Sequence, residues 1–106
     1  MPDLAGWRRG RLPVVPDTAY FTLAPDWICE VLSPGTARLD RHKKLAIYAR
    51  EGVPHAWLLD PVQRTLEVLR LEHQQWVIVS VHAGDDEVRA EPFEATPLFL
   101  RRLWVD

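Results

Sequence analysis

Glu30 stands in the middle of an otherwise apolar run, PDWICEVLS (25–33), and its carboxylate is the first candidate for chemistry. The run is rich in β-forming residues and predicts a strand over residues 26–32. Successive side chains of a strand alternate between faces, so Glu30 shares its face with Ile28 and Leu32. A carboxylate on such a face needs a cation, a metal or a proton to compensate its burial. If Glu30 has no chemical role, its carboxylate either forms a salt bridge with a nearby Arg or Lys or lies on an outer, solvated face of the strand.

A second carboxylate for the same site has to come from a neighbouring element. Asp26 has the same parity as Glu30, but four residues of extended strand separate their Cα atoms by ~13 Å, too far for one ion to bridge. Two upstream aspartates remain, Asp3 in MPDLAGW and Asp17 in VPDTAY. Asp17 follows a proline and is typical of a turn. Asp3 precedes LAGW. A short strand formed by LAGW next to the Glu30 strand would place Asp3 beside Glu30.

A helix is expected from the N-cap Thr36 to about Arg50, and it adds a cation to the candidate site. Asp40, Lys44 and Tyr48 lie at positions i, i+4 and i+8, so they form one stripe along this helix. One interpretation is a helical ion pair between Asp40 and Lys44, worth a few tenths of a kcal/mol. The other is that Lys44 reaches the buried carboxylate, because the helix directly follows that strand and must pack back near it.

The elements that must position these residues are one helix and several strands. Gly52 suits the position just after the helix C-terminus. Further strands are expected over residues 55–60, 65–71 and 74–82, followed by a turn at GDD and a short closing helix in PLFLRRLW. The apolar residues assigned to the core are Trp57, Trp76, Val77, Ile78 and Val79. The order strand, helix, strand and then a meander predicts an α/β or α+β fold, in which the helix crosses between two parallel strands.

Length and charge limit what such a domain can do. The chain has 106 residues, enough for one domain with one modest core. Its formal net charge is −2, so it lacks the broad basic field of a protein that coats nucleic acid non-specifically. Any contact with nucleic acid is therefore local. Trp7 beside Arg8, Arg9 and Arg11 is either such a phosphate-contacting patch or a solvated loop.

Cysteine content and hydropathy indicate the compartment. Cys29 is the one cysteine, so no internal disulfide can form, and a reducing compartment such as the cytoplasm is expected. No apolar run approaches the ~20 residues of a membrane span. The first residues, MPDLAGWRRGR, lack the apolar core of a signal peptide.

The segment from Pro25 to Pro61 resembles the core signature of the Uma-two family of restriction endonucleases, within the PD-(D/E)XK nuclease superfamily. The matching features, in order and spacing, are EVLSP, an Asp followed four residues later by Lys, then Tyr, GV, and Trp with DP. PDLAGWRR near the start is similar to the family's upstream PD element. The resemblance covers nearly the whole chain and implies a restriction-endonuclease-like mixed sheet.

The resemblance also implies a site of two carboxylates and one lysine. Asp3 matches the aspartate of the PD element, and Glu30 matches the acidic residue of the (D/E)XK element. Leu32 occupies the position of the usual lysine, and Lys44 on the following helix matches the lysine that the family carries there. With Asp3 and Glu30, the backbone carbonyl of Val31 is expected to bind the metal, by analogy with the superfamily.

The chemistry implied is metal-dependent hydrolysis of DNA phosphodiester bonds. A hard cation neutralises charge on a phosphate and lowers the pKa of bound water. Mg²⁺ prefers oxygen ligands and commonly takes one or two carboxylates, and Mn²⁺ is an alternative. Lys44 would hold the phosphate or stabilise developing charge. On this interpretation the metal compensates the burial of Glu30, and the choice between DNA and RNA stays open.

The family carries a helix and early strands before the PD element, whereas Asp3 is the third residue of this chain. The sequence thus predicts a single but partial endonuclease-like domain over residues 1–106, shortened at its N-terminus. The alternative function is a non-catalytic remnant that acts as a folding, interaction or oligomerisation module. Such a remnant could associate as a homodimer, because an unpaired strand edge invites pairing with another chain.

Overall fold

The computed structural model describes residues 3–8, 24–33 and 37–104. Its elements, in chain order, are β1 (Leu4–Gly6), β2 (Trp27–Val31), α1 (Ala37–Arg50), β3 (His55–Asp60), β4 (Thr65–Glu72), β5 (Gln75–Ala83), β6 (Glu87–Val88), β7 (Leu98–Phe99) and the 3₁₀ helix η1 (Leu100–Leu103). Each expected strand and the closing helix is confirmed to within a residue or two. The predicted N-cap Thr36 lies outside the described residues.

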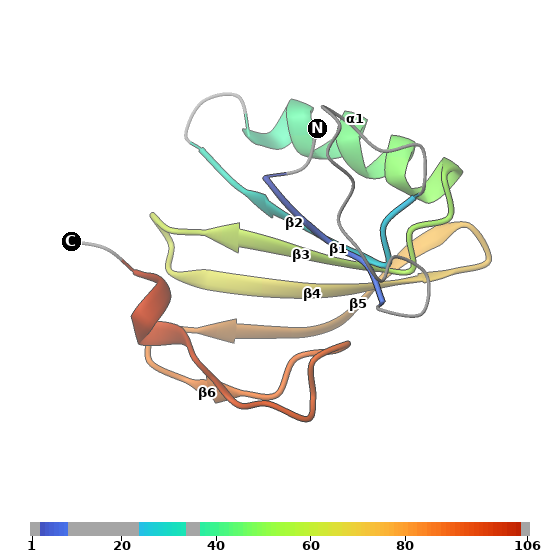
Figure 1. The fold of residues 1–106 in the computed structure, drawn as a ribbon. Coiled ribbons are helices and arrows are strands. Elements are labelled where there is room, and N and C mark those ends of the chain that lie inside the picture. The colour runs from blue at the N-terminus through green and yellow to red at the C-terminus, as the bar shows by residue number, and fades with distance from the viewer. Residues whose placement is uncertain (1–2, 9–23, 34–36, 105–106) are drawn as a thin grey trace, which may run out of the picture.

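Five strands form one mixed sheet in the order β1-β2-β3-β4-β5, and β6 pairs with β7 separately. The pair β2–β3 is parallel, with Glu30 opposite Leu58, and the other pairs of the large sheet are antiparallel. A parallel pair needs a crossover connection, and α1 supplies it, as predicted. Figure 1 shows α1 over one side of the sheet and η1 with β6 on the other.

The C-terminus of α1 is fixed by a Schellman motif. Gly52 has a φ of 77°, the left-handed conformation that favours glycine. Its N–H donates to the carbonyl of Ala49 at 3.1 Å, and the N–H of Val53 donates to the carbonyl of Tyr48 at 3.0 Å. The sequence prediction for Gly52 is therefore confirmed. The motif ends the helix one turn after Tyr48 and returns the chain toward β3.

Two apolar clusters pack on the two faces of the sheet. The first lies between α1 and the sheet and consists of Ile28, Tyr48, Val53, Ala56, Leu58 and Leu69. The second lies under η1 and the β6–β7 pair and consists of Leu66, Val68, Val88, Ala90, Leu100 and Trp104. Trp76 packs against the first cluster and Trp57 against the second, each partly buried. The first cluster packs α1 against β2 and β3.

The prediction that Val77, Ile78 and Val79 belong to the core is wrong. Their exposed fractions are 39%, 59% and 38%. They lie on β5, which is an edge strand of the five-stranded sheet. A run of β-branched residues is typical of a strand buried on both faces, but at the sheet edge the covering elements reach only part of the strand.

In the described part of the chain, no helix is long and apolar enough to cross a bilayer.

We expect Gly52→Ala to lower the free energy of unfolding by ~1 kcal/mol, because an L side chain is strained at this φ. A Cβ at Gly52 would meet no atom within 4 Å, so backbone strain and not a clash is the cause. Gly52→Asn should lose less, since asparagine tolerates the left-handed region. Urea unfolding followed by circular dichroism measures both. Equal stability of the alanine variant and the parent would contradict the helix-end assignment.

Candidate functional site

Glu30 is buried on β2, with 4% of its surface exposed. It faces α1, as the strand alternation with Ile28 predicts, because Ile28 belongs to the cluster under α1. Both carboxylate oxygens accept hydrogen bonds from this helix. Oε2 lies 3.1 Å from Nζ of Lys44, and Oε1 lies 2.5 Å from the hydroxyl of Tyr48. The helix therefore supplies two donors to one buried carboxylate.

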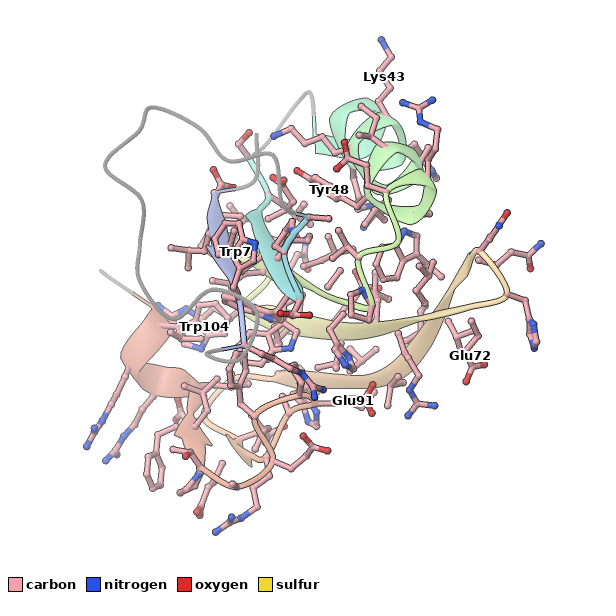
Figure 2. All side chains as sticks on the ribbon, turned by 45° about the vertical axis from the view of Figure 1, so that its right-hand side comes forward. Trp7, Lys43, Tyr48, Glu72, Glu91 and Trp104 are labelled. Atoms are coloured by element: carbon pink, nitrogen blue, oxygen red, sulfur yellow. The ribbon has the colours of Figure 1, made fainter. Side chains whose placement is uncertain are left out.

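The stripe along α1 explains how these donors meet Glu30. Lys44 and Tyr48 are four residues apart, so they lie on the same side of the helix, as the sequence predicts. Figure 2 shows Tyr48 between α1 and the strands, while Lys43 extends away from them. The side chain of Asp40, the third member of the predicted stripe, lies outside what the structure describes. The structure pairs Lys44 with Glu30.

Tyr48 is the residue that the sequence analysis did not assign to the site. Its side chain is buried, and its hydroxyl donates to Oε1 of Glu30. Burial, followed by the hydrogen bond to Glu30, raises the pKa of the Tyr48 hydroxyl above its ordinary value. The hydroxyl therefore stays protonated and keeps donating to the carboxylate. The sequence contains the pattern that could have identified Tyr48, because it lies four residues after Lys44 on the same side of the helix.

Asp3 comes close to the same place from β1. The register pairs Leu4 with Cys29, so one step along it places Asp3 opposite Glu30. Oδ2 of Asp3 accepts a hydrogen bond from the backbone N–H of Val31 at 2.7 Å. Asp3 itself is exposed, and this hydrogen bond uses one of its two carboxylate oxygens, Oδ2. The first aspartate of the sequence thus lies at the end of β2 that carries Glu30.

The other aspartates considered for the site differ from Asp3. Asp26 lies at the opposite end of β2, where its Oδ2 accepts the N–H of Arg8 at 2.7 Å. This placement agrees with its exclusion as a partner of Glu30. Asp17, the alternative upstream candidate, lies outside the described residues.

The two carboxylates act on a common neighbourhood. Burial, together with the charges of Asp3 and Glu30, raises the pKa of the Cys29 thiol to about 12. The charges of the same two carboxylates contribute to the raised pKa of Tyr48. The negative charges of Asp3 and Glu30 therefore both act on the Cys29 thiol and on the Tyr48 hydroxyl.

The groups at this end of the sheet can be compared with the ligands that a divalent cation prefers. Among the described residues no group of three or more His, Cys, Asp and Glu side chains gathers. Asp3 and Glu30 provide two carboxylates, and Mg²⁺ commonly takes one or two while keeping several waters. The N–H of Val31 faces β1, since it donates to Asp3, and the carbonyl oxygen of the same strand residue faces that side too. The donor set therefore fits a hard cation.

Glu30 also has partners within the protein. The sequence led to the expectation that a metal compensates the burial of this carboxylate. Lys44 and Tyr48 already provide that compensation, through an ion pair and a hydrogen bond. The salt bridge that the sequence offered as the alternative role of Glu30 is therefore present, with Lys44 as the partner.

Trp7 and Arg8, two members of the predicted aromatic and basic patch, lie away from this carboxylate. They line a pocket of about 210 Å³ together with Gly6, Asp26, Trp27, His55, Pro92 and Phe93. The pocket is at the end of β2 opposite Glu30. Arg9 and Arg11 of the predicted patch lie outside the described residues.

We expect Cys29 to react with a thiol reagent such as DTNB roughly 1,000-fold more slowly in the native protein at pH 8 than in urea. The reactive species is the thiolate, and a thiol whose pKa is raised to about 12 stays protonated at that pH. The unfolded protein is the matched control, because it contains the same single cysteine. Fast labelling of the native protein would show that this side of β2 is more open than described.

Comparison with known proteins places this geometry in a family. The family profile described as "Uma2: Putative restriction endonuclease" matches residues 1–99. No protein with a curated description matches the chain. Among solved structures, the chain is similar to the crystal structure of "a putative nuclease belonging to DUF820" from Anabaena variabilis ATCC 29413, with a TM-score of 0.71 and 27% identity.

The similarity to the Anabaena protein covers 98% of this chain and 59% of that chain, so this chain spans about three fifths of its length. The five-stranded mixed sheet with one crossover helix agrees with the restriction-endonuclease-like fold expected from the sequence. Because the family profile covers residues 1–99 of 106, the chain belongs to the Uma2 family.

Proposed function

We propose that this protein is a Mg²⁺-dependent endonuclease that hydrolyses DNA phosphodiester bonds, with Mn²⁺ as an alternative cation. The observation that carries the proposal is a buried carboxylate, Glu30, contacted by Lys44 and accompanied by Asp3 from the neighbouring strand. The chain also belongs to the Uma2 family, whose profile matches residues 1–99.

The proposed ligands of the cation are the carboxylates of Asp3 and Glu30 and the carbonyl oxygen of Val31. When bound there, the cation would neutralise charge on the phosphate and lower the pKa of a water molecule. Asp3 is held in place by its hydrogen bond from the backbone of Val31. Glu30 is held by the donors on α1. The protein thereby orients both carboxylates before any substrate arrives.

Lys44 is proposed to contact the phosphate that is cleaved. Its side chain is 35% exposed although it contacts a carboxylate that is 5% exposed. The ammonium group therefore lies between the buried carboxylate and solvent, where a phosphate could approach it. A lysine in this position can stabilise the negative charge that develops on the phosphate oxygens.

The charge of the whole chain supports a local mode of DNA contact. With a net charge of −2 the protein has little long-range attraction for a polyanion. A cation held by two carboxylates would supply the missing positive charge at the point of cleavage. A reducing compartment such as the cytoplasm suits this chain, because Cys29 is its single cysteine and is buried as a free thiol.

One observation favours the alternative, a non-catalytic module. Both oxygens of Glu30 already have donors from within the protein, so the carboxylate is stable without a cation. On that interpretation Glu30, Lys44 and Tyr48 form a structural network that attaches α1 to β2. Measured cleavage separates the two functions.

We expect the protein to nick supercoiled plasmid DNA in the presence of Mg²⁺ or Mn²⁺, and Glu30→Gln to abolish the activity. A neutral amide is a much weaker ligand for a hard cation than a carboxylate. Lys44→Ala should lower turnover by about 100-fold, as expected for the loss of one group that stabilises the transition state. The assay is gel electrophoresis of the plasmid over time.

Lys43→Ala is the matched control for this assay. Lys43 is exposed and extends away from the sheet on the same helix, so its removal changes the net charge equally without touching the site (Figure 2). This variant should cleave like the parent. Cleavage by Glu30→Gln at the parent's rate would exclude Glu30 from catalysis, and absence of cleavage by the parent would favour the non-catalytic module.

A further inference from the structure

We propose that the two oxygens of Glu30 have different duties: Tyr48 holds Oε1 permanently, while Lys44 on Oε2 is a displaceable counter-ion that competes with the divalent cation. This inference rests on the proposed function. It assigns Tyr48 as a positioning residue. It also gives Lys44 a second role, in the protein before a cation binds.

Tyr48 has the surroundings of a fixed donor. Its side chain is 6% exposed and packs in the cluster with Ile28 and Val53. Its backbone carbonyl accepts the N–H of Val53 in the motif that ends α1. Ring and backbone are thus held independently, so the hydroxyl has little freedom to leave Oε1 of Glu30. Removal of that hydroxyl would leave a buried carboxylate oxygen without its donor.

Lys44 has the surroundings of a donor that can leave. Its side chain is 35% exposed, and its ammonium contacts Oε2 of Glu30 at 3.1 Å. Lysine carries its charge on a flexible four-carbon stem, so rotation of that stem can move the ammonium into water. The move hydrates the ammonium further, and this hydration offsets part of the lost contact with Glu30. The two donors on Glu30 therefore differ in how readily each can be replaced.

The β1 side of Glu30 is where the competition would occur. Asp3 lies opposite Glu30 in the register of β1 and β2 and is exposed, so solvent reaches this proposed ligand from the β1 side. Two positive charges near the same carboxylate oxygen repel each other. An ammonium on Oε2 therefore weakens cation binding, and by reciprocity cation binding weakens the contact of Lys44.

This competition gives Lys44 two successive partners. In the cation-free protein its ammonium compensates the buried charge of Glu30. Once that charge is compensated by a cation, the ammonium becomes available to a substrate phosphate. The lysine would thus change partner without any rearrangement of the backbone, because only its side chain needs to rotate.

The test measures the affinity for Mn²⁺ alone, without DNA, by the electron paramagnetic resonance signal of the free ion. Lys44→Met removes the charge and keeps the length of the side chain, and it should tighten Mn²⁺ binding by about tenfold. Tyr48→Phe keeps the ring in the core and removes the hydroxyl, and it should weaken binding by about tenfold, as loss of a group that orients a ligand does. The two substitutions act in opposite directions, which a purely structural role does not predict.

Lys43→Met is the control, since it removes the same charge from an exposed position of α1 and should change the affinity less than about twofold. If Lys44→Met does not fold, as judged by circular dichroism, Lys44→Gln tests the same point. Unchanged or weaker Mn²⁺ binding in the folded Lys44 variant would overturn the competition. Unchanged binding in Tyr48→Phe would overturn the positioning role.

Glu30→Gln separates this inference from the proposed function. If the parent binds Mn²⁺ and Glu30→Gln binds it equally well, Glu30 is not a ligand and the proposed function loses its cation site. If Glu30→Gln loses binding while Lys44→Met equals the parent, the cation site stands and only the competition fails. Loss in Glu30→Gln together with tighter binding in Lys44→Met supports both.

Discussion

The buried carboxylate of Glu30 is the constraint on which the arrangement of this domain depends. A charge that is 4% exposed on a central strand is stable only if neighbouring groups compensate it. Here the compensation comes from an ammonium and a phenol on one helix, Lys44 and Tyr48. Loss of one partner of a buried ion pair typically costs 3–5 kcal/mol, although the partial exposure of Lys44 reduces this figure here. Helix α1 is consequently attached to β2 by polar contacts as well as by apolar packing.

The order of the strands brings a second carboxylate to this attachment. Because β2 and β3 are parallel, the chain has to cross the sheet between them, and α1 is that crossing. Because β1 runs antiparallel to β2, its first residues lie beside the last residues of β2. Asp3 and Glu30 therefore meet from segments 27 positions apart in the sequence. The second cluster, under η1, supports the opposite face and leaves this end of the sheet to the polar groups.

Local patterns predicted the strands, the helix, its glycine end and the approach of Lys44 to Glu30, because alternation and the i+4 spacing are properties of single elements. They did not identify Tyr48 as a partner of the carboxylate. An aromatic residue on the inner stripe of a helix has the same pattern whether it only packs or also donates a hydrogen bond. The exposure of Ile78 was missed for another reason, since membership of an edge strand depends on the order of the sheet and not on the residues of the strand. The compensation of Glu30 by side chains was likewise decided by tertiary contacts.

Tyr48 joins the architecture and the site through two different atoms. Its backbone carbonyl takes part in the motif that ends α1, and any residue could provide that atom. Its hydroxyl holds Glu30, and among the aromatic residues that could fill the same space phenylalanine lacks this group. The packing of the ring and the helix-end motif therefore do not depend on the hydroxyl, whereas the compensation of Glu30 does. Loss of this single oxygen atom would keep the shape of the domain but take a donor from a buried carboxylate, so stability and chemistry would change together without a visible change of structure.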